Sequence, residues 1–484
     1  MMQLANIHIA NLDRERTPYE ECFPWRPLWD EACIARGEKA IVSGAAESPA
    51  SQEYLTRLFD ASTAEALHDD GSITRAIQDE GQFDRPEDLS VAVEFKFLVP
   101  YRPRGTAETA DCHRHPPVAT ADMISNATTM TDTDRRRLQD HAFGAIAATI
   151  RTCDGQEAIS ALEMQQQQQE QSQPLSAYWA THWLVKRSNS AEPSATHPNY
   201  ADWLWVPVEI NSPKLSWTDR AGTLATIRAV LRALHASHRI ETNYSCEVHV
   251  HVGRRDGRRL SLPSLQRLAA LCWLTEPVLR SVKDPRSPNF VHKYTWSSPL
   301  RERSRLASEL RKHRQPQQNL EMRAIRRILA STSHIELGRL MTGEGRPYRR
   351  LGFNFYSLVK ETLSEADRTE LETVECRFLE GTMDEDVIMG WMQIFGCLVQ
   401  SALASPSRDD DGDRLDLMLP LLGLLEQTGQ CSTTTETFVS LMEDLGIDTS
   451  SFAPVLAMIH HAQPASTGAE NLLVMGDSTL RPHT

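Results

Sequence analysis

The sequence has few cysteines and no long hydrophobic run. Its nine cysteines are spread over 484 residues without a Cys-x-x-Cys pair, which excludes a disulfide framework and a zinc ribbon. No stretch approaches the ~18 consecutive apolar residues of a membrane span, and the N-terminal residues lack the apolar core of a signal peptide. We therefore expect a cytoplasmic, intracellular protein without a membrane partner.

Positive charge is also scarce over the chain as a whole. The 51 Lys and Arg residues are outnumbered by 65 Asp and Glu residues, which gives a formal net charge of -14. Since nucleic acids attract cationic surfaces, this balance excludes a chain-wide nucleic-acid-binding protein. Residues 254–350 are the exception, with 22 Lys and Arg against 8 Asp and Glu. This segment is either a set of solvated, salt-bridged helices or a positively charged surface that attracts a polyanion.

The length and composition indicate a folded protein with one large domain. Hydrophobic residues make up 40% and charged residues 24% of the chain, as in ordinary globular proteins. We expect the main domain over residues 86–405 with a flexible insertion at about 101–199, an N-terminal leader over 1–85, and a linker with a small helical segment over 406–484. The Gln-rich tract 161–174 is expected to be mobile, because it has too little apolar surface to order itself.

Four segments of the main domain have the alternating pattern of β-strands. They are Ser90–Val99, Leu204–Ile210, Cys246–Gly253 and Thr373–Glu380. Helical patterns such as those at 262–282 and 384–403 separate or follow them. The sequence therefore predicts an α+β fold with a mixed or antiparallel sheet, with helices packed on one face and the other face lining a cleft.

The polar positions of these strands carry a set of ionisable residues. They are Glu94, Lys96, Glu209, His249, His251, Glu375, Arg377 and Glu380. Two histidines two residues apart on a strand point to the same side about 7 Å apart, which suits a metal ion, an anion or a partly exposed sheet face. Carboxylates bind Mg²⁺ and guanidinium groups bind phosphate. If the strands bring these side chains together, they form a candidate site.

The run from Val91 to Leu403 resembles the amidoligase family of fungi and bacteria, in its fungal type, which belongs with the carboxylate-amine ligases of glutamine synthetase-like fold. The resemblance rests on motifs that follow in the family's order. They are Val93-Glu94-Phe95, Val208 to Pro213, Ser245 to Gly253, Gly352-Phe353-Asn354-Phe355, and Val374 to Asp384.

The resemblance implies a glutamine synthetase-like sheet and a ligase that uses ATP and Mg²⁺ to join a small-molecule or peptide carboxylate to an amine through an acyl phosphate. Such chemistry needs cations around the transferred phosphoryl group. By motif position, Glu94, Glu209 and Glu375 would hold metal, and His249, His251, Arg377 and Asn354 would bind the nucleotide. All of these except Asn354 are also implied to be catalytic. The basic segment would then lie beside the ATP.

Two residues depart from the family's pattern. Lys96 stands where a second Glu is usual, and a cation there would repel Mg²⁺ or occupy its place. Glu247 replaces a Gly, which puts a carboxylate where close backbone approach is expected. Two alternatives therefore stay open beside the ligase: a catalytically degenerate relative that binds a nucleotide or a partner, and a metal-dependent hydrolase that uses His249 and His251.

Overall fold

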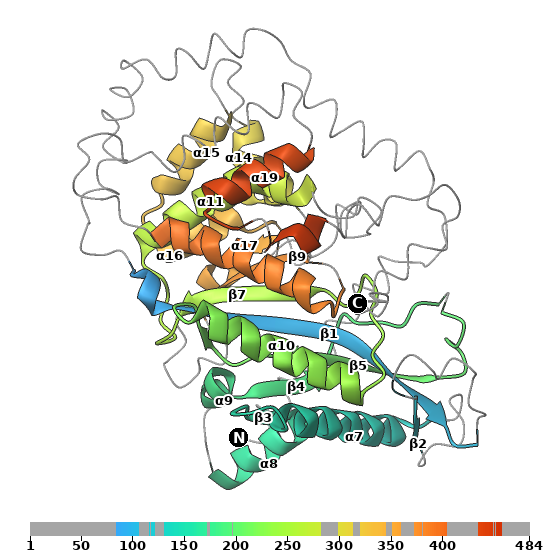
Figure 1. Cartoon of the computed structure of the whole chain (residues 1–484). Coiled ribbons are helices and arrows are strands. Elements are labelled where there is room, and N and C mark those ends of the chain that lie inside the picture. Colours follow the sequence, from blue (N-terminus) through green and yellow to red (C-terminus); the bar gives the residue numbers. More distant parts are fainter. Residues whose placement is uncertain are drawn as a thin grey trace, which may run out of the picture.

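The computed structural model describes the main domain and part of the C-terminal segment. The described residues are 84–105, 116, 118–121, 130–171, 175–195, 197–281, 299–312, 320–344, 351–359, 372–379, 381–403, 434–448, 450 and 452–456. Glu380, all but the last two residues of the expected leader 1–85, and most of 406–484 lie outside them. Figure 1 shows how the described elements are arranged.

One mixed sheet forms the centre of the described structure (Figure 1). Its nine strands are β1 (Leu89–Pro103), β2 (Ala119–Ala121), β3 (Ala158–Ser160), β4 (Trp183–Arg187), β5 (Leu204–Asn211), β6 (Leu215–Ser216), β7 (Val248–Arg254), β8 (Phe353–Asn354) and β9 (Val374–Leu379). The spatial order is β3-β4-β5-β1-β7-β9-β8, and β2 and β6 also pair with β1. Pairs β1–β2 and β3–β4 are parallel and the others are antiparallel. The structure thus confirms the prediction of a mixed sheet with helices.

Helices cover the apolar face of this sheet. In Figure 1, α7 (Asp132–Arg151), α10 (Arg220–Ser237) and α17 (Glu385–Leu403) lie across it. The other described helices are α8 (Ala161–Gln171), α9 (Leu175–Thr181), α11 (Leu262–Ser281), α13 (Leu300–Arg303), α14 (Arg305–Lys312), α15 (Leu320–Leu329), α16 (His334–Met341) and α19 (Thr434–Asp444), with short 3₁₀ turns at Pro86–Asp88 and Tyr356–Val359. Val93, Phe95 and Phe97 of β1 are buried in the resulting core, where Phe95 stacks on Trp183 at 6.3 Å between ring centroids. Each such side chain contributes about 1.5–3 kcal/mol by burial.

The opposite face of the sheet is mostly polar, with a small apolar cluster on each side of the polar centre. Strand alternation places Leu184 of β4 on this face, where it packs with Tyr178 of α9. On the other side, Leu98 of β1 packs with Cys246 and Ala191.

The described residues of the segment 101–199 do not form a flexible insertion, because they supply integral parts of the fold. Strands β3 and β4 pair with each other, and β4 pairs with β5. Helix α7 buries Leu138, Phe143 and Ile146 against the sheet, and Thr131 caps its first turn. The expectation of a mobile tract at 161–174 is also wrong for 161–171, which form α8. Glutamine has a good helix propensity, so a Gln-rich segment of low hydrophobicity can still form a helix.

Helix α17 is apolar enough to resemble a membrane span. Among the described residues it is the one helix that reaches the length and hydropathy required, and 78% of its apolar stretch is buried within the protein. Burial of that kind is expected for the central helix of a globular core.

A close backbone contact fixes the end of β9 against the loop before β7. A Cβ atom at Gly381 would lie 1.8 Å from the carbonyl oxygen of Asn243 and 3.1 Å from the Cβ of Cys246. Gly381→Ala is therefore expected to lower the free energy of unfolding by about 3 kcal/mol, because backbone atoms must shift to admit the methyl group. Urea denaturation measures this change.

Gly144 provides the matched control for that substitution. It lies inside α7 with nothing within 4 Å of an added Cβ. Gly144→Ala is expected to raise the free energy of unfolding by about 0.5–1 kcal/mol through helix propensity. An equal, small effect at both glycines would contradict the close contact at Gly381.

Candidate functional site

Strand pairing brings the polar side chains of five strands onto one face of the sheet. Glu94 of β1 pairs with His249 of β7 and, on its other side, with Asn211 of β5. His251 of β7 pairs with Glu375 of β9. Asn354 of β8 pairs with the same Glu375. Because directly paired residues project their side chains to the same face, the register alone assembles these groups.

His249 lies at the centre of this polar cluster. Its side chain is 1% exposed and is surrounded by carboxylates. The Nδ1 atom is 2.9 Å from Glu94 Oε1 and 2.9 Å from Glu375 Oε1. The Nε2 atom is 3.1 Å from Glu247 Oε2. Both ring nitrogens therefore face negatively charged oxygens, an arrangement that favours the imidazolium form.

Arg377 joins two of the same carboxylates from β9. Its Nη1 atom donates to Glu375 Oε1 at 2.5 Å, and its Nη2 atom donates to Glu247 Oε2 at 3.4 Å. The β7–β9 pairing is irregular between Val248, which pairs with Leu379, and Val250, which pairs with Cys376, so Arg377 lies in the irregular stretch of β9. A bulge re-aims side chains next to it, and here it allows the guanidinium group to reach Glu247 beyond the end of β7.

Lys96 is a second buried cation of the cluster. Its Nζ atom forms an ion pair with Glu94 Oε1 and lies 3.0 Å from His249 Nδ1. The lysine side chain is 5% exposed. Lys96 and His249 both contact Glu94 Oε1, so this one carboxylate is shared by the two side chains.

The charges in the cluster reinforce each other. Burial raises the pKa of Glu94, but Lys96 and His249 outweigh it and hold that pKa well below its usual value. Burial also raises the pKa of Glu375, and Arg377 and His249 likewise outweigh it. Against burial, the hydrogen bond from His249 and the charge of Arg377 lower the pKa of Glu247 to about 2. At neutral pH these carboxyl groups are therefore ionised.

The pKa of His249 shifts in the opposite direction. Burial and the charges of Arg377 and Lys96 lower it, but the carboxylates, Glu94 and Glu375 among them, overcome this and raise it to about 9. The imidazolium is therefore the main form at pH 7. The three cations Lys96, His249 and Arg377 thus balance the carboxylates Glu94, Glu247 and Glu375 within one buried group.

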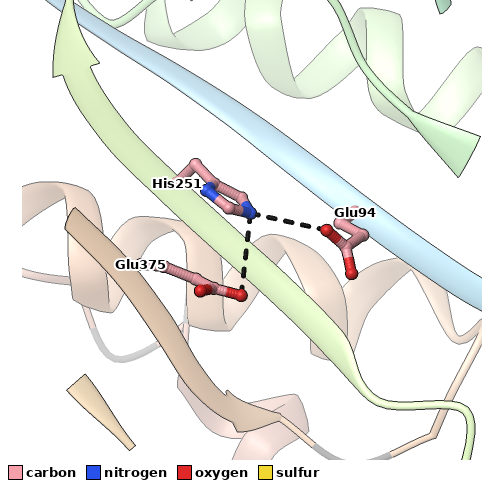
Figure 2. A group of neighbouring side chains, drawn as sticks. All are labelled: Glu94, His251 and Glu375. Carbon is pink, nitrogen blue, oxygen red and sulfur yellow. Dashed lines mark ion pairs between the residues drawn. The ribbon is translucent and has the colours of Figure 1, made fainter. Parts of the chain in front are cut away.

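His251 lies at the more exposed side of the cluster and is aimed at two carboxylates. Figure 2 shows its imidazole between Glu94 and Glu375. The Nε2 atom is 3.7 Å from Glu94 Oε2 and 3.8 Å from Glu375 Oε1. This nitrogen is buried and has no hydrogen-bond partner among the described residues. The other nitrogen, Nδ1, lies 3.1 Å from Thr373 Oγ1.

These three residues fit a metal ion. One ligand atom each from Glu94, His251 and Glu375 lies within 4.8 Å of the others. A metal-binding histidine usually uses one nitrogen for the ion and the other for a hydrogen bond that fixes the ring, as the Thr373 contact does here. The unpaired Nε2 atom and two ionised carboxylates are suitable ligands for a divalent cation.

Glu209 lies on the same face but in a different ion pair. Its Oε1 atom is 2.9 Å from Lys186 Nζ of β4, and the register pairs Glu209 with both Lys186 and Lys96. The Lys186 ammonium group also lies 4.9 Å from the centre of the Trp179 ring. Glu209 is therefore flanked by lysines in the pairing, and it is not part of the group that fits a metal ion.

Several residues of the cluster were not among the expected site residues. Glu247 bridges His249 and Arg377, Lys186 binds Glu209, and Asn211 donates to Glu94 Oε2 at 3.3 Å. Strand alternation was the signal for Asn211, which is two residues after Glu209. Lys186 was not expected at the site because its segment was predicted to be part of an insertion and not a strand of the sheet.

The basic segment that follows β7 is partly neutralised by ion pairs. Arg327 of α15 pairs with Glu309 and Glu336 at 3.1 and 3.0 Å, and Arg301 pairs with Glu321. These contacts are those of salt-bridged helices, and exposed pairs of this kind contribute about 0–1 kcal/mol each.

The fold and the polar face together define a mixed α/β protein with residues suited to binding a metal ion and phosphate. The family model described as "Putative amidoligase enzyme" matches residues 140–398, which is more than half of the chain. The chain therefore belongs to this amidoligase family of ligase-type enzymes. The match includes β5, β7, β8 and β9 but begins after β1, so Glu94 and Lys96 lie outside it. No curated protein and no solved structure matches the chain.

Proposed function

We propose that this protein is an ATP-dependent carboxylate-amine ligase that forms an amide bond through an acyl phosphate. The observation that carries the proposal is the position of Glu375. Its Oε1 atom lies 2.5 Å from the guanidinium of Arg377 and 3.8 Å from the unpaired nitrogen of His251. One carboxylate thus joins a group that binds phosphate to a group that binds a divalent cation.

The residues suggest a division of roles for this reaction. Bound Mg²⁺ would supply positive charge to the phosphate oxygens, and Glu94, His251 and Glu375 would hold it. Arg377 would orient the transferred phosphoryl group, and Asn354, which donates to Glu375 Oε2, keeps that carboxylate in place. The substrate carboxylate oxygen would attack the γ-phosphorus of ATP as ADP leaves, and the amine nitrogen would then attack the acyl carbon and give up a proton as phosphate leaves. Both steps depend on positioning and charge stabilisation.

We also propose that the fold is glutamine synthetase-like. A sheet with helices on its apolar face and a charged, metal-fitting opposite face is the arrangement expected of a glutamine synthetase-like ligase. The buried charges also favour this activity over a hydrolase that uses both histidines. His249 is 1% exposed and enclosed by carboxylates, whereas His251 Nε2 has no hydrogen-bond partner among the described residues. The two imidazoles therefore do not share one ion.

The test is stabilisation of the full chain by MgATP. A ligand at 100 times its Kd adds about 2.7 kcal/mol to the free energy of unfolding, so saturating MgATP is expected to raise Tm. ATP with EDTA is expected to raise the Tm less than MgATP does. In His251→Gln, MgATP and ATP with EDTA are expected to raise the Tm equally. His182→Gln is the matched control, because His182 contacts Thr181 and Tyr178 away from the cluster.

Turnover separates the ligase from a degenerate relative. Phosphate release from MgATP is measured with a panel of carboxylates and amines, including peptides. Release that needs both a carboxylate and an amine supports the ligase. An unchanged Tm with MgATP would contradict the proposal. Stabilisation by MgATP without phosphate release would favour the degenerate alternative, which binds a nucleotide but does not turn it over.

A further inference from the structure

Lys96 is a buried lysine whose neighbours on this face of the sheet include two glutamates and a histidine. Glu94 precedes it by two residues on the same face of β1, and Glu209 is its partner on β5. Its ammonium group contacts Glu94 Oε1 and the ring of His249. A buried ammonium ion is stable only when anions compensate for its lost hydration, and Glu94 does so here.

The two oxygens of Glu94 have different partners as a result. Oε1 faces Lys96 and His249. Oε2 faces His251 Nε2 and accepts a hydrogen bond from Asn211. Only Oε2 is therefore directed toward the unpaired nitrogen of His251. On the Lys96 side, the carboxylate is already neutralised by a cation that belongs to the chain.

We propose that Lys96 acts as a fixed cation of this site and limits it to one divalent metal ion, held by Glu94, His251 and Glu375. The inference rests on the metal-dependent function proposed above and adds the metal count and its cause. A second divalent ion on the Lys96 side of Glu94 would meet the ammonium group that already contacts Glu94 Oε1, in a poorly hydrated environment where repulsion is strong. Lys96 therefore takes the place of a second metal ion.

Glu209 supports the same arrangement. As the partner of Lys96 in the β1–β5 pairing, it is the carboxylate best placed to complete a second metal site with Glu94. It instead binds Lys186 at 2.9 Å. Lysines of this sheet face thus neutralise the oxygens that a second ion would need.

The experiment counts bound Mn²⁺, a paramagnetic substitute for Mg²⁺, on the full chain. Protein stripped with EDTA and dialysed is titrated by calorimetry, and electron paramagnetic resonance measures free Mn²⁺. The wild type is expected to bind one ion. Lys96→Glu is expected to bind two, and Lys96→Met is expected to bind the first ion at least about tenfold more tightly, because a repelling charge is lost. Lys186→Met, which removes a lysine from the same face, is expected to bind one ion with nearly unchanged affinity.

Circular dichroism and thermal melts establish that each variant is folded. If Lys96→Glu does not fold, the affinity of Lys96→Met for the first ion still tests the role of Lys96. Two ions in the wild type, or no tightening in Lys96→Met, would overturn the role of Lys96. No bound Mn²⁺ in the wild type would overturn it as well. The count does not depend on turnover, so one ion in the wild type and two in Lys96→Glu uphold the inference even if MgATP and phosphate-release assays reject the ligase.

Discussion

Glu375→Gln is expected to weaken Mn²⁺ binding at least about 100-fold. Loss of a residue that only supports a ligand already costs about 10–100-fold in metal affinity, and this substitution removes a charged ligand itself. The amide keeps the shape of the side chain and its contact with Asn354. Calorimetric titration of the metal-free protein measures the change.

Glu163→Gln is the control for that substitution. Glu163 is a part-exposed carboxylate of α8 that pairs with Arg151 at 3.1 Å, away from the polar cluster. It is expected to leave Mn²⁺ affinity unchanged. Equal affinities for Glu375→Gln and the wild type would show that the metal ion, if bound, uses other residues.

Arg377→Met is expected to lower the free energy of unfolding at pH 7 by about 3–5 kcal/mol, because two buried carboxylates lose one of their cationic partners. The affected groups are Glu375 and Glu247, with Arg377 itself 4% exposed. Urea denaturation measures the loss. Arg151→Met removes a part-exposed partner of Glu163 instead, and its ion-pair contribution is expected to be about 0–1 kcal/mol.

The effect of Arg377→Met is also expected to depend on pH. In the wild type, burial raises the pKa of Glu247, but His249 and Arg377 outweigh it and lower the pKa to about 2. A lowered carboxyl pKa stabilises the fold above the unfolded value of about 4.3, and that stability is lost as pH falls toward 2. Without Arg377 the pKa of Glu247 rises, so the destabilisation should be smaller at pH 4 than at pH 7. A loss of equal size at both pH values would mean that Arg377 acts by packing alone.

Much of the fold could be predicted from local patterns. Alternation predicted β1, β5, β7 and β9, and helical periodicity predicted α11 and α17, each close to its observed bounds. The strands within 101–199 were not predicted, because short strands such as β3 carry too few residues for a periodic signal. The Gln-rich helix α8 was missed because low hydrophobicity was taken to mean disorder. Short strands are recognisable only through the neighbours that pair with them.

The polar cluster was predictable residue by residue but not in its connections. Period-2 spacing placed Glu94, His249 and Glu375 on polar strand faces, and the register brings these three together. The same spacing also placed Glu209 there, yet its carboxylate binds Lys186 from a strand that was not expected. Partner choice among side chains depends on which strands lie next to each other, and that order is a long-range property.

The amino-acid sequence by itself determined the face on which each ionisable side chain of these strands would lie, because alternation along a strand is a local consequence of backbone geometry. It also carried the motif order that indicates the amidoligase family. Only the tertiary structure decided that β1 lies between β5 and β7, and that Lys96 is buried against Glu94 and His249. The strand order is set by packing the whole core, and it determines which charges meet and therefore where the chain leaves room for a metal ion.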